Sequence, residues 1–405
     1  MNTPSSNRKR RIGSLLFGLL LVLNVAIPKA GFKIGDVPIT FGYMYAISLG
    51  LVCFPSGIAH FMRDGKRSAY IVTYSTLIFV FLVMFALFLG VENIGFYFSM
   101  IFGFCVLPII LMVCFASDDL CLDALETYLI WSVRFAVLYG IFLFVYKIKT
   151  GQFIEIPYVT VNADDAGKMG EKYIQRSDDV FKLISTYNNG NIFGVCLLMM
   201  LPLYDMLERR LGFRALARFA LILTLSRTVW VALMLYETFL VKRPLWQRMA
   251  MLLVGAAGIF SMLSLIGTNG EFLFDSTLGG RMAVVDQLRL SIFPLVKFDY
   301  VSEIFWVSVA YFGGVVGVII FAGLFALIFV MFLSSAQTPY LRAATVGVVN
   351  FIFCSFVDAA AIYIPTMFVF WLVVRVGFIK GRANNGRDHL RRPVDRNARN
   401  WTFCN

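Results

Sequence analysis

The stretch ALARFALILTLSRTVWVALMLYETFLV, residues 215–241, places an arginine in the middle of an apolar run. That arginine, Arg227, lies in the motif Ser226-Arg227-Thr228. An arginine at the centre of a lipid bilayer costs roughly 3 kcal/mol or more of insertion free energy, so ionisable residues in such runs usually face a polar cavity and serve a function. The position of Arg227 therefore constrains the fold of the whole chain.

The composition is that of a helical membrane protein. Of the 405 residues, 59% are hydrophobic and 15% are charged, and the mean hydropathy is +0.78. Soluble domains average about 25% charged residues. The apolar runs have the length of transmembrane helices and lack the ten-residue alternation of a β-barrel. The net charge of +12 does not indicate nucleic-acid binding, because the basic residues lie mostly in short loops and in the tail, where membrane topology accounts for them.

The apolar runs predict an all-α polytopic integral membrane protein with about 12 transmembrane helices, two of them short, and two long extracytoplasmic loops. The expected spans are about 12–28, 39–60, 68–90, 94–116, 125–147, 191–207, 213–226, 228–241, 249–267, 304–333, 343–358 and 364–379. The chain then divides into an N-terminal membrane region of five spans (1–148), a first loop (149–190), a central membrane region (191–267), a second loop (268–303), C-terminal spans (304–379) and a basic tail (380–405).

Lysine and arginine are concentrated in alternate loops, which predicts the orientation, because basic residues mark cytoplasmic loops. The basic segments are 8–11, 63–67, 209–214, 242–248, 342 and the tail from 380 to 399. Both termini are therefore expected in the cytoplasm. The long polar loops then fall on the outer side, and loops of that length are often functional.

The same rule predicts a break at Arg227. A single helix over 215–241 would put Arg214 and Lys242 on opposite sides of the membrane. Two short helices that meet at Ser226-Arg227-Thr228 avoid this conflict and place the turn in a recess open to the outer side, because broken backbone at bilayer depth must line a cavity or be buried in protein. A guanidinium in such a recess suits phosphate. The alternative is a structural arginine paired with a carboxylate such as Asp358.

Four segments together resemble the O-antigen polymerase and O-antigen ligase superfamily. LTLSRTVWVAL (223–233) resembles the helix of that family with the pattern LTxSR, and STYNNGNIFGVCLLMMLPL (185–203) is similar to its asparagine-containing helix start. GGRMAVVDQLRLSIFPL (279–295) and FWVSVAYFGGVVGVIIFAGLF (305–325) resemble the outer loop and the helix that follows it. Ligases of the family carry a histidine at the end of that loop. This chain has only His60 and His389, both predicted near the cytoplasmic side, which favours the polymerase branch.

The resemblance implies a metal-independent membrane glycosyltransferase without cofactors in the inner membrane of a bacterium. It would join oligosaccharide repeat units carried on undecaprenyl pyrophosphate, for O-antigen, capsule or exopolysaccharide synthesis. Membrane lipid and a separate chain-length regulator protein are the other expected partners, and no nucleic acid is expected. A transporter or flippase for lipid-linked oligosaccharides, a ligase-like transferase and a non-catalytic scaffold are the alternatives.

The expected catalytic residues are Arg227 and Arg281, which would neutralise the departing pyrophosphate, and Glu303, which would act as the general base. Other outer carboxylates, Asp275, Asp286 and Asp299, are rivals of Glu303. The expected substrate-binding residues are Arg289, Asn188, Asn191, Tyr187, Ser226 and Asp358. Each has a structural alternative: a solvated charge for Arg289, helix capping for the asparagines, an interfacial belt for the tyrosine, bonding of freed backbone groups for Ser226 (as for Thr224 and Thr228) and pairing with Arg227 for the aspartate.

Overall fold

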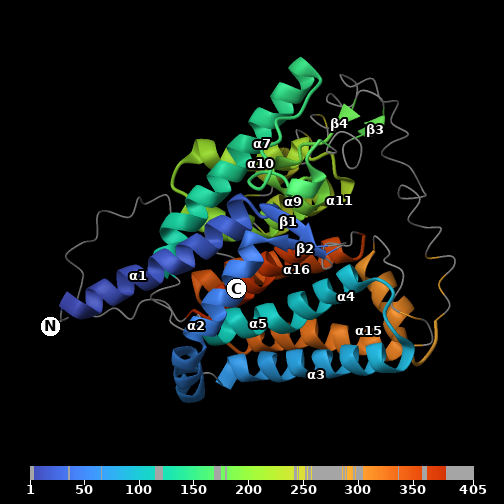
Figure 1. Cartoon of the computed structure of the whole chain (residues 1–405). Coiled ribbons are helices and arrows are strands. Elements are labelled where there is room, and N and C mark those ends of the chain that lie inside the picture. The colour runs from blue at the N-terminus through green and yellow to red at the C-terminus, as the bar shows by residue number, and fades with distance from the viewer. Residues whose placement is uncertain are drawn as a thin grey trace.

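The computed structural model describes most of the membrane region as a helical bundle with two small β-hairpins (Figure 1). The described residues are 4–34, 37–64, 66–114, 122–167, 175–177, 180–240, 244, 246–250, 253, 257, 285, 288, 290–294, 297, 304–335, 337–357 and 363–379. The statements below concern these residues.

The N-terminal half consists of long apolar helices and one hairpin. Its elements are α1 (Pro4–Leu21) with the π-helical turn η1 (Val22–Ala26), β1 (Gly31–Ile34) paired antiparallel with β2 (Val37–Thr40), α2 (Phe41–Asp64), α3 (Lys66–Leu89), α4 (Ile94–Ile101) running through η2 (Phe102–Val106), α5 (Leu107–Ile109) and η3 (Ile110–Cys114), and η4 (Leu125–Leu129) running into α7 (Ile130–Thr150). α3 and α15 lie side by side along one edge of the bundle (Figure 1).

The C-terminal half holds the shorter helices. Its elements are η5 (Ala163–Asp165), β3 (Gln175–Ser177) paired with β4 (Val180–Phe181), η6 (Ser185–Tyr187), α9 (Gly190–Leu207), α10 (Leu211–Leu223), α11 (Arg227–Leu235) with η7 (Tyr236–Leu240), α15 (Phe305–Leu333), α16 (Pro339–Ser355) and α17 (Ile364–Gly377). α17 is buried along its whole length, so it forms the centre of the bundle.

Five described helical segments are long and apolar enough to cross a membrane. They are Ala69–Leu89, Ile94–Val113, Leu122–Thr150, Gly190–Leu207 and Phe305–Leu333, and shorter apolar helices lie at Arg11–Ala26, Phe41–Pro55 and Ile364–Gly377. The prediction of a helical membrane protein is confirmed in this form, although two hairpins accompany the helices. The number of spans stays a prediction, because most of the expected span at 249–267 lies outside the described residues.

The predicted break near Arg227 is confirmed. α10 ends at Leu223 and α11 begins at Arg227, so three residues form the turn. The two helices have 13 and 9 residues, and each is too short to cross a bilayer alone, since a crossing needs about 20 residues.

A second irregularity lies within α15. Gly314 has a φ of +60°, which favours glycine, and it kinks the helix about nine residues from its start. The N–H groups of Val315 and Val316 are released from the helix by the kink, and they donate instead to the carbonyls of Ser291 and Ile292 at 2.9 and 3.2 Å. Part of the second long loop therefore packs against the first third of α15, and the backbone groups at the kink are satisfied by protein groups, as broken backbone within a membrane must be.

The helices around α9 have one common end. The Trp306 indole donates to the Ser355 hydroxyl at 3.0 Å, which puts the start of α15 beside the last residue of α16. Gly347 lies against the Met199 carbonyl and Asn350 donates to the Leu198 carbonyl, so α16 runs antiparallel to α9. We call this end, where α9, α11, α15 and α17 begin, the Arg227 end, and the opposite end the Glu208 end. The positive-inside rule predicts that the Arg227 end is the outer one.

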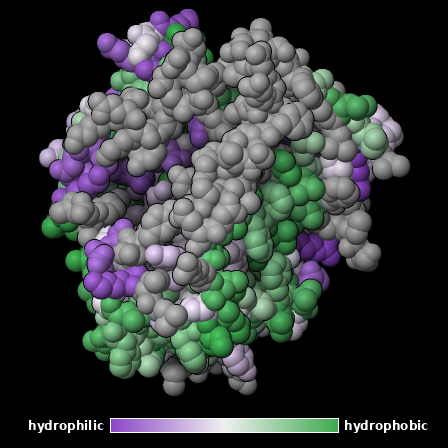
Figure 2. Space-filling model, turned by 90° about the vertical axis from the view of Figure 1, so that its right-hand side faces the viewer, coloured by the Kyte–Doolittle hydropathy of each residue, from purple (hydrophilic) through white to green (hydrophobic). Residues whose placement is uncertain are grey.

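Figure 2 views the molecule from the side of Figure 1 at which α4 and α15 begin. Hydrophilic residues gather around a hollow on part of this face, and hydrophobic residues cover the adjoining helices.

The orientation can be tested by cysteine labelling of spheroplasts with a thiol reagent that does not cross membranes. In a background without the seven native cysteines, Val159→Cys, an exposed site in the first long loop, should be labelled from outside. Leu211→Cys, an exposed site at the start of α10, should be labelled only after permeabilisation. The reverse pattern would place the Arg227 end in the cytoplasm.

Candidate functional site

Two polar regions flank the hairpin of α10 and α11, one at each of its ends. At the Arg227 end, the segment before α9 is joined to the turn between α10 and α11: the Leu183 N–H donates to the Leu223 carbonyl at 2.9 Å. Glycines permit the close approach. A Cβ on Gly190 would lie 3.2 Å from the Thr224 carbonyl oxygen, and one on Gly194 would lie 2.7 Å from the Val229 side chain. The asparagine-containing segment and the Ser-Arg segment, about 36 residues apart in sequence, are therefore neighbours.

The turn itself is tightly built. The Thr224 hydroxyl donates to the Leu221 carbonyl at 2.7 Å, as expected for a hydroxyl that bonds freed backbone. Leu225 has a φ of +51°, an uncommon conformation for a bulky side chain. The Trp230 indole donates to the Ile222 carbonyl at 2.8 Å across the turn. Strained backbone that persists in a buried turn must be held by its surroundings, and it occurs preferentially at functional sites.

Arg227 is the first residue of α11 and is partly buried. It therefore lies at the positive end of the helix dipole, where the first backbone N–H groups have no partner within the helix. Ser226 before it is buried, and its side chain makes no capping hydrogen bond. A guanidinium at this position adds a full charge to a site that already favours anions.

The three asparagines of the neighbouring segment have different roles. Asn189 caps α9, because its side-chain oxygen accepts from the N–H groups of Asn191 and Ile192. Asn188 adopts a left-handed conformation with a φ of +56°, and its Oδ1 is buried without a hydrogen-bond partner in the described part of the chain. The Asn191 Oδ1 accepts from the Nζ of Lys182 at 3.4 Å. Helix capping is thus the role of Asn189, and the substrate-binding roles of Asn188 and Asn191 stay predictions.

Tyr187 does not have the position expected of a sugar-stacking residue. It is fully buried, and its hydroxyl donates to the Val25 carbonyl at 3.0 Å. The Thr186 hydroxyl donates to the Ala26 carbonyl at 2.6 Å beside it. These residues fix the segment before α9 to the end of η1, so Tyr187 has a structural role.

Four expected site residues lie outside the described residues: Arg281, Arg289, Glu303 and Asp358. Their roles stay predictions. Lys182 places a second cation in this region, beside Asn191. It was not among the residues predicted from the sequence, although it is a basic residue just before the asparagine-containing segment.

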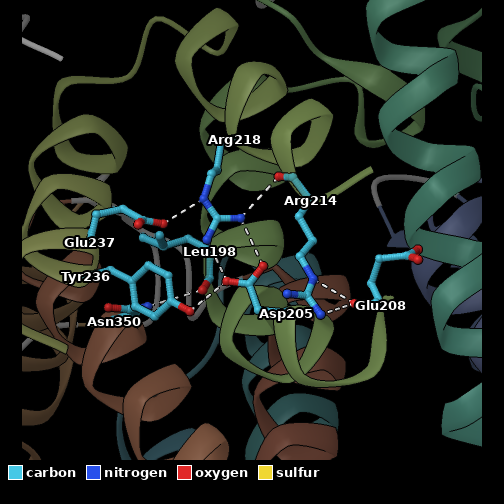
Figure 3. Close-up of polar contacts among 8 residues, drawn as sticks. All are labelled: Leu198, Asp205, Glu208, Arg214, Arg218, Tyr236, Glu237 and Asn350. Atoms are coloured by element: carbon cyan, nitrogen blue, oxygen red, sulfur yellow. Dashed lines mark hydrogen bonds and ion pairs between the residues drawn. The ribbon is translucent and has the colours of Figure 1, made fainter. Parts of the chain in front are cut away.

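The second polar region is an ion cluster nearer the Glu208 end (Figure 3). The Arg218 guanidinium forms a bidentate pair with Asp205 at 2.9 and 2.7 Å, and its Nε donates to Glu237 at 2.6 Å. The Tyr236 hydroxyl donates to Asp205 at 2.8 Å. Asp205 belongs to α9, Arg218 to α10 and Glu237 to η7, so one guanidinium connects three helical segments.

Glu208 continues the cluster at the end of α9. Its carboxylate forms a bidentate pair with Arg134 at 2.6 and 2.8 Å and accepts from the Tyr204 hydroxyl at 3.1 Å and the Arg210 N–H at 2.9 Å. The Arg214 guanidinium donates to the Glu208 backbone carbonyl. Burial alone would raise the pKa of Glu208, but the hydrogen bonds from Arg134 and from the Arg210 N–H, with the charge of Arg134, lower it to about 2.

The partner of Arg134, Glu208, is 74 residues away in sequence. The signal in the sequence was weak: two acids near the end of one apolar run and two arginines at the start of the next. Each carboxylate of the cluster is paired with a guanidinium, and Arg218 pairs with both Asp205 and Glu237, so the cluster links α9, α10 and η7.

A comparison with protein-family models finds no match, and a comparison with curated proteins finds none either. The resemblance to the O-antigen polymerase and ligase superfamily therefore depends on the quoted motifs alone.

Breaking the Arg134–Glu208 pair should destabilise the protein strongly. Glu208→Gln leaves a buried guanidinium without its counter-charge, which costs about 3–5 kcal/mol in buried pairs. We expect a clear fall in the thermal unfolding temperature in detergent. The matched control is Glu92→Gln, because Glu92 pairs with Lys297 at 2.9 Å and both side chains are more than half exposed. Exposed pairs contribute at most about 1 kcal/mol. Equal shifts for the two variants would contradict the role assigned to Glu208.

Proposed function

We propose that this protein is a membrane glycosyltransferase that polymerises oligosaccharide repeat units carried on undecaprenyl pyrophosphate. The reaction would take place at the outer face of the bacterial inner membrane. The growing glycan would be transferred from its lipid carrier to the incoming lipid-linked unit, and undecaprenyl pyrophosphate would leave. The observation that carries the proposal is the junction of the Arg227 turn with the asparagine segment before α9.

The junction has the chemistry that a lipid-linked pyrophosphate requires. Such a pyrophosphate lies at headgroup depth while its polyprenyl chain stays in the lipid. Arg227 and Lys182 provide cationic groups at this junction. α9 and α11 both begin at the junction, so the positive ends of their helix dipoles add to these charges. A cation that meets the leaving pyrophosphate stabilises the charge that develops as the glycosidic bond breaks.

The amide groups suit the sugar part of the substrate. The Asn188 Oδ1 is a buried acceptor without a hydrogen-bond partner among the described residues, and buried acceptors in proteins are nearly always satisfied. A sugar hydroxyl would satisfy it. Glu303 remains our proposed general base, and Arg281 and Arg289 remain proposed ligands of the pyrophosphate.

Two other arginines of the helical bundle, Arg218 and Arg134, are engaged by carboxylates. The Arg218 guanidinium is engaged by Asp205, Glu237 and the Arg214 carbonyl, and Arg134 is engaged by Glu208. A substrate anion would have to displace a carboxylate from either one. A flippase would use a similar cation, so transport is the outcome that the experiment below must separate from polymerisation.

The test is reconstitution in liposomes with a defined undecaprenyl-pyrophosphate-linked repeat unit. The wild type should give a ladder of glycan lengths. Arg227→Ala should reduce the rate by roughly 100-fold or more, the usual cost of removing one group that stabilises transition-state charge. Arg227→Lys keeps the charge but loses the bidentate geometry, so we expect only weak rescue.

The matched control is Arg209→Ala, because Arg209 is an exposed arginine at the Glu208 end and should be dispensable. If a competent substrate crosses the bilayer but yields no ladder, the polymerase proposal fails and a flippase replaces it. An unchanged ladder in Arg227→Ala would remove Arg227 from the site.

A further inference from the structure

Lys29 lies at the Arg227 end in a position that sequence reasoning did not single out. It belongs to the tight turn between η1 and β1, in which the Ala30 N–H donates to the Ile27 carbonyl at 3.1 Å. The preceding residues, Val25 and Ala26, accept the hydroxyl hydrogen bonds of Tyr187 and Thr186. Lys29 is thus held next to the segment that leads into α9.

The ammonium group of Lys29 contacts an aromatic ring. Its Nζ is 5.8 Å from the centre of the Tyr363 ring, within the range of a cation–π contact. In the described part of the chain, its ammonium has no hydrogen-bonding or ion-pair partner. Lys33, four residues later, differs: its Nζ is 2.6 Å from Asp165.

The surroundings of Lys29 make an unpaired cation unfavourable. The protein around it removes water from the ammonium and lowers its pKa from the ordinary value of a lysine. Asp165, the carboxylate that acts on it through space, already accepts from Lys33. An anionic ligand would supply the missing counter-charge, because buried charges are normally paired.

Lys29 and Arg227 are on different sides of α9. Gly194 of α9 packs against Val229 of α11, whereas the Cys196 thiol lies 3.6 Å from the Thr366 hydroxyl of α17. Gly194 and Cys196 are two positions apart, and residues at that spacing are separated by about 200° around a helix axis. α11 and α17 therefore flank α9 on nearly opposite sides. Tyr363 immediately precedes α17 and lies one turn before Thr366, so the Lys29 ammonium belongs to the α17 side.

We propose that Lys29 and Tyr363 form a second binding site for a lipid-linked phosphate group, on the side of α9 opposite Arg227. This inference rests on the proposed function, since a polymerase must hold two carrier lipids at once. The chain that is being transferred and the unit that receives it each bear a pyrophosphate. One would be bound at Arg227 and the other at Lys29, so that the glycan parts of both meet above the start of α9.

Binding stoichiometry tests this site without relying on catalysis. Native mass spectrometry of the purified full chain in a neutral detergent, with undecaprenyl pyrophosphate added, should show two bound molecules for the wild type. Lys29→Met and Arg227→Ala should each show one, and the double variant none. Loss of a charge-assisted contact should weaken the affected site roughly 10- to 100-fold. Lys29→Arg should retain two.

The matched control is Lys33→Met, which removes a lysine of the same region that is already paired with Asp165 and should leave two molecules bound. Unchanged thermal unfolding of Lys29→Met would show that the loss is local. Two molecules bound by Lys29→Met would overturn the site. Displacement from the wild type by an equal concentration of phosphatidylglycerol would identify a membrane phospholipid as the ligand and overturn the assignment to a second substrate.

The binding result and the polymerase proposal can fail separately. If the wild type binds two molecules and Lys29→Met binds one, the site stands even when no ladder forms in liposomes. If a ladder forms and the wild type binds only one molecule, the polymerase stands and the Lys29 site is wrong.

Discussion

The Arg218 guanidinium, bound to Asp205 and Glu237, is the interaction on which the central part of the structure depends. Asp205 is 1% exposed, and a lone charge buried at this depth would be strongly unfavourable. The three partners come from α9, α10 and η7, so the pairing is satisfied only when the chain turns back between α10 and α11. The cluster thus favours two short helices over one long helix across the membrane.

The same constraint positions the candidate site. Arg218 is nine residues before Arg227, and α10 connects the ion cluster to the turn at the opposite end of the hairpin. Carboxylates fix the hairpin toward the Glu208 end, and the Leu183–Leu223 hydrogen bond fixes it at the Arg227 end, so the turn before Arg227 lies against the segment that leads into α9. The paired charges of the ion cluster maintain the fold, and we propose that the cations near the helix starts bind an anionic substrate.

Much of this arrangement could be predicted from sequence. The apolar runs located the helices, and the distribution of basic residues required the break near Arg227. The partners of Arg134 and Arg218 could not be predicted, because ion pairing between helices depends on packing and leaves no fixed spacing in sequence. The burial of Tyr187 was missed for the same reason: its hydroxyl partner, Val25, is 162 residues away. The contact of Lys29 with Tyr363 could not be predicted either, because the two residues are far apart in sequence.

The most direct measurement is a cryo-EM structure of the protein in neutral-lipid nanodiscs with undecaprenyl pyrophosphate bound. We predict diphosphate density against the Arg227 guanidinium at the start of α11, with Arg218 still paired to Asp205 and Glu237. Diphosphate density bound to Arg218 or Arg134 in place of their carboxylates, with none at Arg227, would contradict the assignment of the ion cluster to structure and of Arg227 to the substrate.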